Sequence, residues 1–124
     1  MTELCAVEVT ARNGVAVARL SGEIDASNAD ATFAAVEKAL SEQPQGLILD
    51  LSGLDYLDSA GVRLLFKLSH NAPADSILRA VVPPAAPIRR VLELANVVHS
   101  LPLADSADAA LEGMRSDLGS DLPV

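Results

Sequence analysis

The sequence predicts one α/β domain, built on a mixed sheet of four to five strands with an opening antiparallel hairpin and about four helices. Its length of 124 residues is close to the usual size of a single domain. Half of the residues are apolar, which is typical of a chain that buries a globular core. Short apolar runs alternate with segments of helical periodicity, and this order favours parallel strands joined by right-handed helical crossovers.

The opening hairpin is predicted from two short apolar runs, over residues 5–9 and 15–20. Asn13 and Gly14 lie between them, and Asn-Gly is the dipeptide best suited to the positive φ angles of a tight turn. Cys5, the only cysteine, alternates with polar residues in the first run. We therefore assign it to a strand, with a redox role as the less common alternative, and expect no internal disulfide.

A helix over residues 28–41 and a strand over residues 47–51 come next. In the helix, apolar side chains recur at helical spacing, and either Ser27 or Asn28 can cap its start. The strand is short, continuously apolar and bounded by turn residues on both sides, as expected of a strand buried on both faces.

The second helix is predicted over residues 59–70 and is mostly apolar. Its polar residues Arg63, Lys67 and His70 recur with spacings of four and three, so they share one narrow stripe. Turning the helix by half would bury these three polar groups, which is unfavourable. We therefore expect the stripe to be exposed.

The C-terminal third predicts a strand over residues 77–82 and then a short helix with Pro87 in its first turn. Asn96 is the expected left-handed residue at the end of this helix. The apolar run over residues 97–101 is interpreted as a weak edge strand.

A last helix is expected after Asp105 or Ser106, either of which is a suitable cap. Its inner face consists of Ala107, Ala110, Leu111 and Met114. We assign residues 1–118 to the domain and residues 119–124 to a loose C-terminal tail.

Charge and aromatic content argue against nucleic acid as a partner. The chain has 17 acidic and 9 basic residues, for a net charge of −8, whereas phosphate backbones are bound by an excess of Lys and Arg. It has no Trp, one Tyr and two Phe, too few for base stacking. There is no basic leader before an apolar stretch, and no apolar run approaches the ~20 residues of a membrane span. We expect a cytoplasmic protein that does not bind membranes.

Polar and small residues interrupt the apolar pattern over residues 54–62, at a strand-to-helix junction. Ser59 stands at the start of the predicted helix, where free backbone N–H groups and the positive end of the helix dipole stabilise an anion. The commoner role of a serine there is simply to cap the helix, and its replacement by alanine then costs about 0.5–2 kcal/mol. The local pattern leaves both roles open.

Enzymatic roles are less well supported by the sequence. A serine nucleophile needs a base within hydrogen-bond reach, and His70 and His99 stand in unrelated segments. Asp55 and Asp58, with Asp50 nearby, suggest a hydrolytic site with a divalent metal, but a base and a third ligand are missing. Neither type of Gly-rich nucleotide-binding loop is present. We therefore expect no catalysis, no cofactor and no metal.

With these residues in place, the chain resembles bacterial anti-sigma factor antagonists of the STAS-domain family over residues 5–115. Residues 20–25 (LSGEID) resemble the family's L-x-G-E-[IL]-D, and residues 57–61 (LDSAG) resemble its D-S-[ST]-G signature. Residues 47–51 resemble its central strand, and residues 88–97 resemble the helix before its last strand. Each motif is weak alone, but their order and spacing make the set specific.

Three positions depart from the family pattern. Ala60 replaces the second Ser or Thr of the signature, and Asn96 replaces a common Gly at a helix end. Val62 and Arg63 stand where the family often has Leu-Gly, which places a cation on the expected contact helix. The last departure bears on which partner is bound more than on the class of function.

The resemblance implies a partner switch. The unphosphorylated protein would bind an anti-sigma factor that is also an ATP-dependent serine kinase, and so release a sigma factor. Phosphorylation of Ser59, which matches the family's phosphoacceptor, would end the binding, and a serine phosphatase would reset it. The partner-binding residues that follow from the resemblance are Asp25, Asp58, Ser59, Ala60, Gly61 and Arg63.

Two other functions stay open at this stage. One is a STAS module that is never phosphorylated and acts as a scaffold or sensor in a larger complex, with Ser59 only capping a helix. The other is the metal-dependent hydrolase built on Asp55 and Asp58.

Overall fold

The computed structural model describes residues 5–12, 14–42, 45–72, 76–97 and 101–119. They form one mixed five-stranded sheet of order β1-β2-β3-β4-β5, in which β1 and β2 are antiparallel and all other neighbours are parallel. The strands are β1 (Cys5–Arg12), β2 (Val15–Ile24), β3 (Gly46–Leu57), β4 (Ile77–Val81) and β5 (Leu103–Ala104). The helices in the described residues are α1 (Ala29–Glu42), α2 (Ser59–Asn71), α3 (Arg89–Leu94) and α4 (Ala107–Gly119). The predicted fold class is confirmed.

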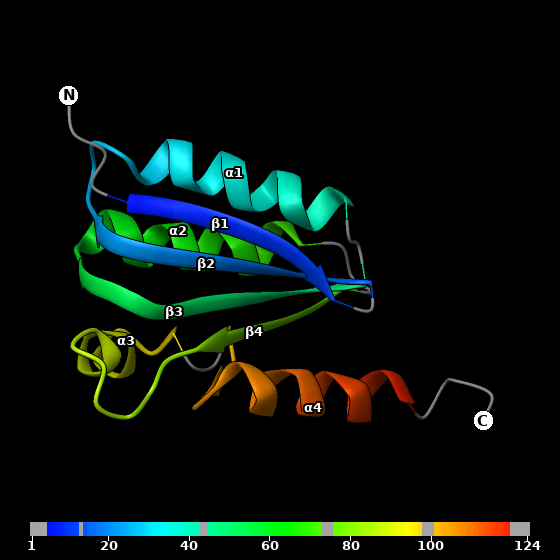
Figure 1. Ribbon diagram of the computed structural model, residues 1–124. Helices are drawn as coiled ribbons and strands as arrows, with labels where there is room; N and C mark the ends of the chain where they lie inside the picture. The colour runs from blue at the N-terminus through cyan, green and yellow to red at the C-terminus, as the bar shows by residue number, and fades with distance from the viewer. Residues whose placement is uncertain (1–4, 13, 43–44, 73–75, 98–100, 120–124) are drawn as a thin grey trace.

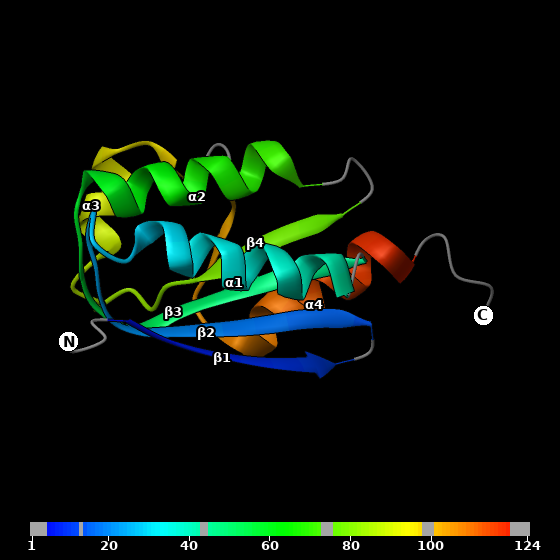
Figure 2. The same cartoon turned by 90° about the horizontal axis from the view of Figure 1, so that it is seen from above.

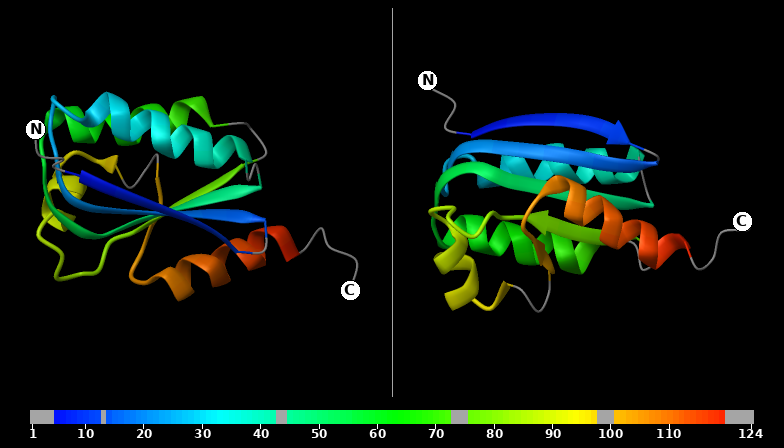
Figure 3. Two further views of the ribbon diagram at one scale, coloured as in Figure 1. Left: turned by 45° about the horizontal axis from the view of Figure 1, so that its top comes forward. Right: turned by 60° about the horizontal axis from the view of Figure 1, so that its bottom comes forward.

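Helices cover both faces of the sheet. α1 and α2 lie side by side on one face, and α3 lies at the end of the molecule where β2 and β3 finish (Figures 1 and 2). α4 covers the opposite face over β3 and β4, as the right-hand view of Figure 3 shows. Two apolar cores result, a large one under α1 and α2 and a smaller one under α4. No helix of the described residues is both long and apolar enough to cross a membrane.

The N-terminal hairpin forms as predicted. β1 and β2 pair without interruption from Cys5 opposite Gly22 to Arg12 opposite Val15. Gly14 has a φ of +82°, the left-handed conformation that a tight hairpin turn requires and that glycine adopts without strain.

β3 is longer than the predicted strand over residues 47–51. It continues through Ser52 and Gly53 to Leu57, because β2 runs alongside it as far as Ile24. The pairing of β2 and β3 is irregular near Gly22, whose φ is +98°. An apolar run predicts a strand only as far as its last apolar residue, whereas the actual strand continues as long as its backbone pairs with a neighbour.

The predicted strand over residues 97–101 is wrong. Residues 98–100 lie outside the described part of the chain, but neither Val97 nor Leu101 belongs to a strand, and Leu101 N–H donates to Val97 C=O at 2.8 Å. The last strand of the described residues is β5 instead. Both Val97 and Leu101 are fully buried. Burial explains their apolar character, and an apolar run alone cannot distinguish a short strand from buried residues outside a strand.

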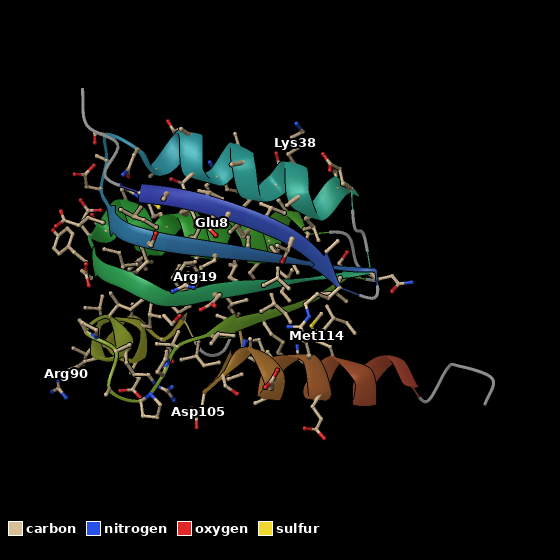
Figure 4. All side chains as sticks on the ribbon, in the orientation of Figure 1. Glu8, Arg19, Lys38, Arg90, Asp105 and Met114 are labelled. Atoms are coloured by element: carbon tan, nitrogen blue, oxygen red, sulfur yellow. The ribbon has the colours of Figure 1, made fainter. Side chains whose placement is uncertain are left out.

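The C-terminal helices agree with the sequence in their caps and faces. Asn96 has a φ of +63°, as predicted for the residue after α3, although α3 itself is only six residues long. Ser106 caps α4, because its Oγ accepts the N–H of Ala109 at 3.1 Å. Met114 rises from α4 toward the sheet (Figure 4) and is buried together with Ala110. The tail beyond residue 119 lies outside the described residues.

Candidate partner-binding site

The start of α2 is capped by Asp58, not by Ser59. Asp58 Oδ1 accepts the backbone N–H of Ala60 at 2.8 Å and that of Gly61 at 3.3 Å, while Asp58 itself keeps an extended backbone. Both residues are good caps, so sequence alone cannot choose between them. The choice follows from the sheet, because Asp58 N–H donates to Ile24 C=O at 3.2 Å and continues the pairing of β3 with β2.

Ser59 is therefore the first residue of the helix, and its side chain is exposed. No side chain or backbone group of the described residues holds its hydroxyl. The N–H groups expected to be free for an anion on Ser59 are partly occupied, because Asp58 takes those of Ala60 and Gly61. The helix dipole remains, so an anion on Ser59 is tolerated but points its charge toward solvent.

Asp25 lies beside the same helix start. It follows Ile24, whose carbonyl accepts the Asp58 N–H, so the two acidic residues lie together where β2 and β3 end. The Asp25 carboxylate is engaged locally, with its Oδ1 accepting the Ser27 hydroxyl at 2.5 Å and the Ser27 N–H at 2.8 Å. These bonds, the hydroxyl first, lower the pKa of Asp25, so it is ionised at neutral pH.

Asn28 keeps this loop in place. Its amide oxygen accepts the Asp25 N–H at 3.0 Å, and its amide nitrogen donates to Glu23 C=O at 2.9 Å. The loop before α1 is therefore tied to the end of β2, which presents Asp25 in a defined position next to α2.

Gly61 is buried where α2 meets the strand ends. A Cβ at this position would lie 2.8 Å from Leu57 Cβ and 3.3 Å from Ile24 Cγ2, so only glycine lets the first turn of the helix approach the sheet this closely. Gly61 thus sets how closely the start of α2 approaches the ends of β2 and β3, whereas Ala60 is half-buried and Ser59 is exposed.

The exposed stripe on α2 is confirmed, since Arg63, Lys67 and His70 are all exposed. Lys67 Nζ lies 4.3 Å from the centre of the Phe33 ring, and His70 Nδ1 lies 2.7 Å from Phe66 C=O. Arg63 has no ion pair in the described residues. It stands one helical turn after Ser59, on the same face.

The metal-site alternative finds no support in the described residues. Asp50 Oδ1 accepts the N–H and the hydroxyl of Ser52, and Asp58 is occupied as the helix cap. No cluster of three or more His, Cys, Asp or Glu residues able to hold a metal is found in that part of the chain. His70 lies in the last turn of α2, far along the helix from Ser59, and His99 falls outside the described residues.

The sequence did not single out the apolar surface at this end of the molecule. Tyr56, near the end of β3, is 49% exposed, and on α3 Leu94 and Val91 are 74% and 38% exposed. The available signal for Tyr56 was its place next to Asp55, in the stretch over residues 54–62 where polar residues interrupt the apolar pattern. Nothing in the sequence indicated the exposed residues of α3, because Val91 and Leu94 are as compatible with a buried helix face as with an exposed one.

Comparison with known proteins decides the family. The model of the STAS domain matches residues 6–110. The chain belongs to the STAS domain family. This STAS domain is 32% identical over 109 residues to the anti-sigma-F factor antagonist RsfB of Mycobacterium tuberculosis, covering 88% of both chains.

Solved structures agree with this assignment. The crystal structure of an anti-sigma factor antagonist from Mycobacterium paratuberculosis superposes on this STAS domain with a TM-score of 0.83 at 29% identity, over 90% of this chain and 94% of that one. The anti-sigma factor antagonist SpoIIAA, in its unphosphorylated form, shares the fold with a TM-score of 0.69 at 22% identity, over 90% of this chain and 97% of that one.

Proposed function

We propose that this STAS domain is an anti-sigma factor antagonist, and that phosphorylation of Ser59 switches its binding off. The unphosphorylated form binds an anti-sigma factor that is also a serine kinase, and so frees a sigma factor. The observation that carries the proposal is the exposed Ser59 hydroxyl, which no described residue holds, at a helix start capped by a different side chain. The antagonist names of the relatives support the same class of function.

The proposed docking surface surrounds Ser59. It comprises Asp25, Asp58, Ser59, Ala60, Gly61 and Arg63. Ser59 and Arg63 are exposed on one face of α2, and Ala60 is half-buried beside them. Asp25 and Asp58 border this face, and buried Gly61 acts through the position of the helix rather than through a side chain. Tyr56, near the end of β3, and Leu94, on α3, are exposed apolar residues, and these two elements meet at the same end of the molecule (Figure 1).

The arrangement allows a switch that does not require refolding. A phosphate on Ser59 adds about −1.5 to −2 charges. The helix cap does not depend on the Ser59 hydroxyl, so α2 keeps its start when that hydroxyl is esterified. The added charge stands near the carboxylates of Asp25 and Asp58, so it weakens the binding of a partner surface that docks there rather than the fold of the domain itself.

In this cycle the STAS domain is the substrate and not the catalyst. The partner kinase transfers the phosphoryl group to Ser59, and a serine phosphatase removes it. SpoIIAA, which has the same fold, has been solved in an unphosphorylated and a phosphorylated form, and this supports a phosphorylation switch in the present domain.

Calorimetric titration tests the proposal, with the anti-sigma factor kinases of the same genome purified one at a time. We expect Ser59→Ala to bind like the wild type and to resist phosphorylation. Ser59→Asp places one charge at the contact and binds more weakly, by roughly a hundredfold for each ~2.8 kcal/mol of repulsion. The phosphorylated protein, with more charge and bulk, binds most weakly.

Ser41→Asp is the matched control. It adds the same charge in the last turn of α1, at the opposite end of the molecule from the start of α2 (Figure 1), and should bind like the wild type. Intact-mass measurement after incubation with each kinase and ATP should show one added phosphoryl group, lost in Ser59→Ala. If no kinase adds it, the domain is an unphosphorylated scaffold or sensor, and the switch is refuted.

A further inference from the structure

β1 is an open edge of the sheet. It stands first in the strand order, and β2 is its one strand neighbour among the described residues. In Figure 2 and in the right-hand view of Figure 3, the described helices leave the outer side of β1 uncovered along its length. Such an edge offers unpaired backbone groups to another strand.

The free side of β1 is also regular. Its eight residues pair with β2 in unbroken register, in contrast to the irregular pairing of β2 with β3. It contains neither Pro nor Lys, the residues that proteins commonly use to block edge pairing.

The alternation of hydrogen-bonded and non-hydrogen-bonded pairs in the hairpin decides which backbone groups of β1 point away from β2. Two residues separate Arg12 from Val15, and in such a hairpin the residues that flank the turn form a hydrogen-bonded pair. Pairs along an antiparallel ladder alternate, so even-numbered residues of β1 bond to β2. Val7, Val9 and Ala11 therefore direct their N–H and C=O groups to the open side.

The charges of β1 make the strand complementary to itself. Glu8 and Arg12 are its two charged residues, both exposed, and they lie on one face with Thr10 midway between them. In an antiparallel pair of two β1 strands centred on Thr10, Glu8 of each copy lies opposite Arg12 of the other. Opposite charges in directly facing positions stabilise a sheet, and facing Thr residues do so as well.

On the other face, the same register covers exposed apolar surface. Val9, which is 48% exposed, then lies opposite Ala11 of the second copy, in a hydrogen-bonded position. Moving the centre of the pair from Thr10 to Glu8, which shifts the register by four residues, would instead place Glu8 opposite Glu8 of the second copy, which is unfavourable.

We propose that two copies of this chain associate through antiparallel pairing of their β1 strands about Thr10, forming one continuous sheet. The paired segment is short, so the association is weak and reversible. β1 and α2 lie on opposite sides of α1 (Figure 2), which leaves the proposed kinase-docking surface accessible in both copies. The association is thus independent of the Ser59 switch.

Sedimentation equilibrium from about 10 μM to 1 mM, in about 0.15 M salt to screen the net negative charge, tests the proposal. We expect the average mass to rise from one chain toward two. Arg12→Glu should weaken this association by about tenfold or more, because Glu8 then faces a carboxylate. Combining Arg12→Glu with Glu8→Arg should restore it. Ala11→Pro removes an outward N–H without affecting the pairing with β2, and should abolish it.

Arg90→Glu, on the exposed side of α3, is the matched control for Arg12→Glu, since it changes the net charge equally at a distant position (Figure 4). It should associate like the wild type, and circular dichroism should show that every variant is folded. A single-chain mass at all concentrations would overturn the proposal. So would association that survives Ala11→Pro, or a double charge reversal that fails to restore it.

Discussion

Replacing Asp58 by alanine should destabilise the domain, whereas replacing Ser59 should not. In the wild type, Asp58 Oδ1 accepts two backbone N–H groups, at 2.8 and 3.3 Å. Loss of such a cap costs about 0.5–2 kcal/mol. A domain of this size loses about 3–6 °C of melting temperature per kcal/mol, so Asp58→Ala should melt roughly 2–12 °C below the wild type.

Ser59→Ala removes no hydrogen bond that the described residues make. Alanine is also a slightly better helix former than serine, by a few tenths of a kcal/mol at most. The melting temperature should therefore stay within about 2 °C of the wild type. This differs from the expectation based on sequence, which assigned the capping cost to Ser59.

Thermal melts followed by circular dichroism, with guanidinium unfolding as a second measure, compare the two variants directly. Asp58→Asn is the control, because asparagine caps helices about as well as aspartate and should stay close to the wild type. If Ser59→Ala melts as low as Asp58→Ala, the assignment of the cap is wrong, and so is the argument that phosphorylation leaves α2 intact.

Two further predictions concern packing and pH. Gly61→Ala should lower the free energy of unfolding by about 1–3 kcal/mol, because its Cβ would lie 2.8 Å from Leu57 Cβ. Gly113→Ala, whose Cβ would have nothing within 4 Å, should raise the free energy of unfolding by up to about 1 kcal/mol. Urea unfolding measures both changes, and two changes of the same sign would contradict the packing argument. Since hydrogen bonds from Ser27 lower the pKa of Asp25 below 3.8, its charged form stabilises the fold above about pH 4, and this contribution disappears as pH falls through the lowered pKa. The stability gap between wild type and Asp25→Asn should therefore narrow from pH 6 to pH 3 in urea titrations, and a constant gap would show that the carboxylate charge contributes nothing.

Local pattern was enough to predict many features of the fold. The Asn-Gly turn, the helical phase that exposes Arg63 and the left-handed Asn96 each depend on backbone preferences or on one face of one helix. The motif around residues 57–61 located the candidate site for the same reason. Its residues adjoin in the chain, so no long-range information was needed to bring them together.

Tertiary structure alone decided the features that depend on a second segment. β3 extends to Leu57 because β2 runs beside it, and Asp58 rather than Ser59 caps α2 because the Ile24 carbonyl holds the Asp58 N–H. The same bond brings Asp25 next to the helix start. Val97 and Leu101 have the apolar character of a strand but lie outside the strands, because burial in the core favours apolar side chains whatever the backbone conformation. The sequence of a segment expresses its own preferences, whereas strand length, cap and neighbours are set by hydrogen bonds between segments far apart in the chain.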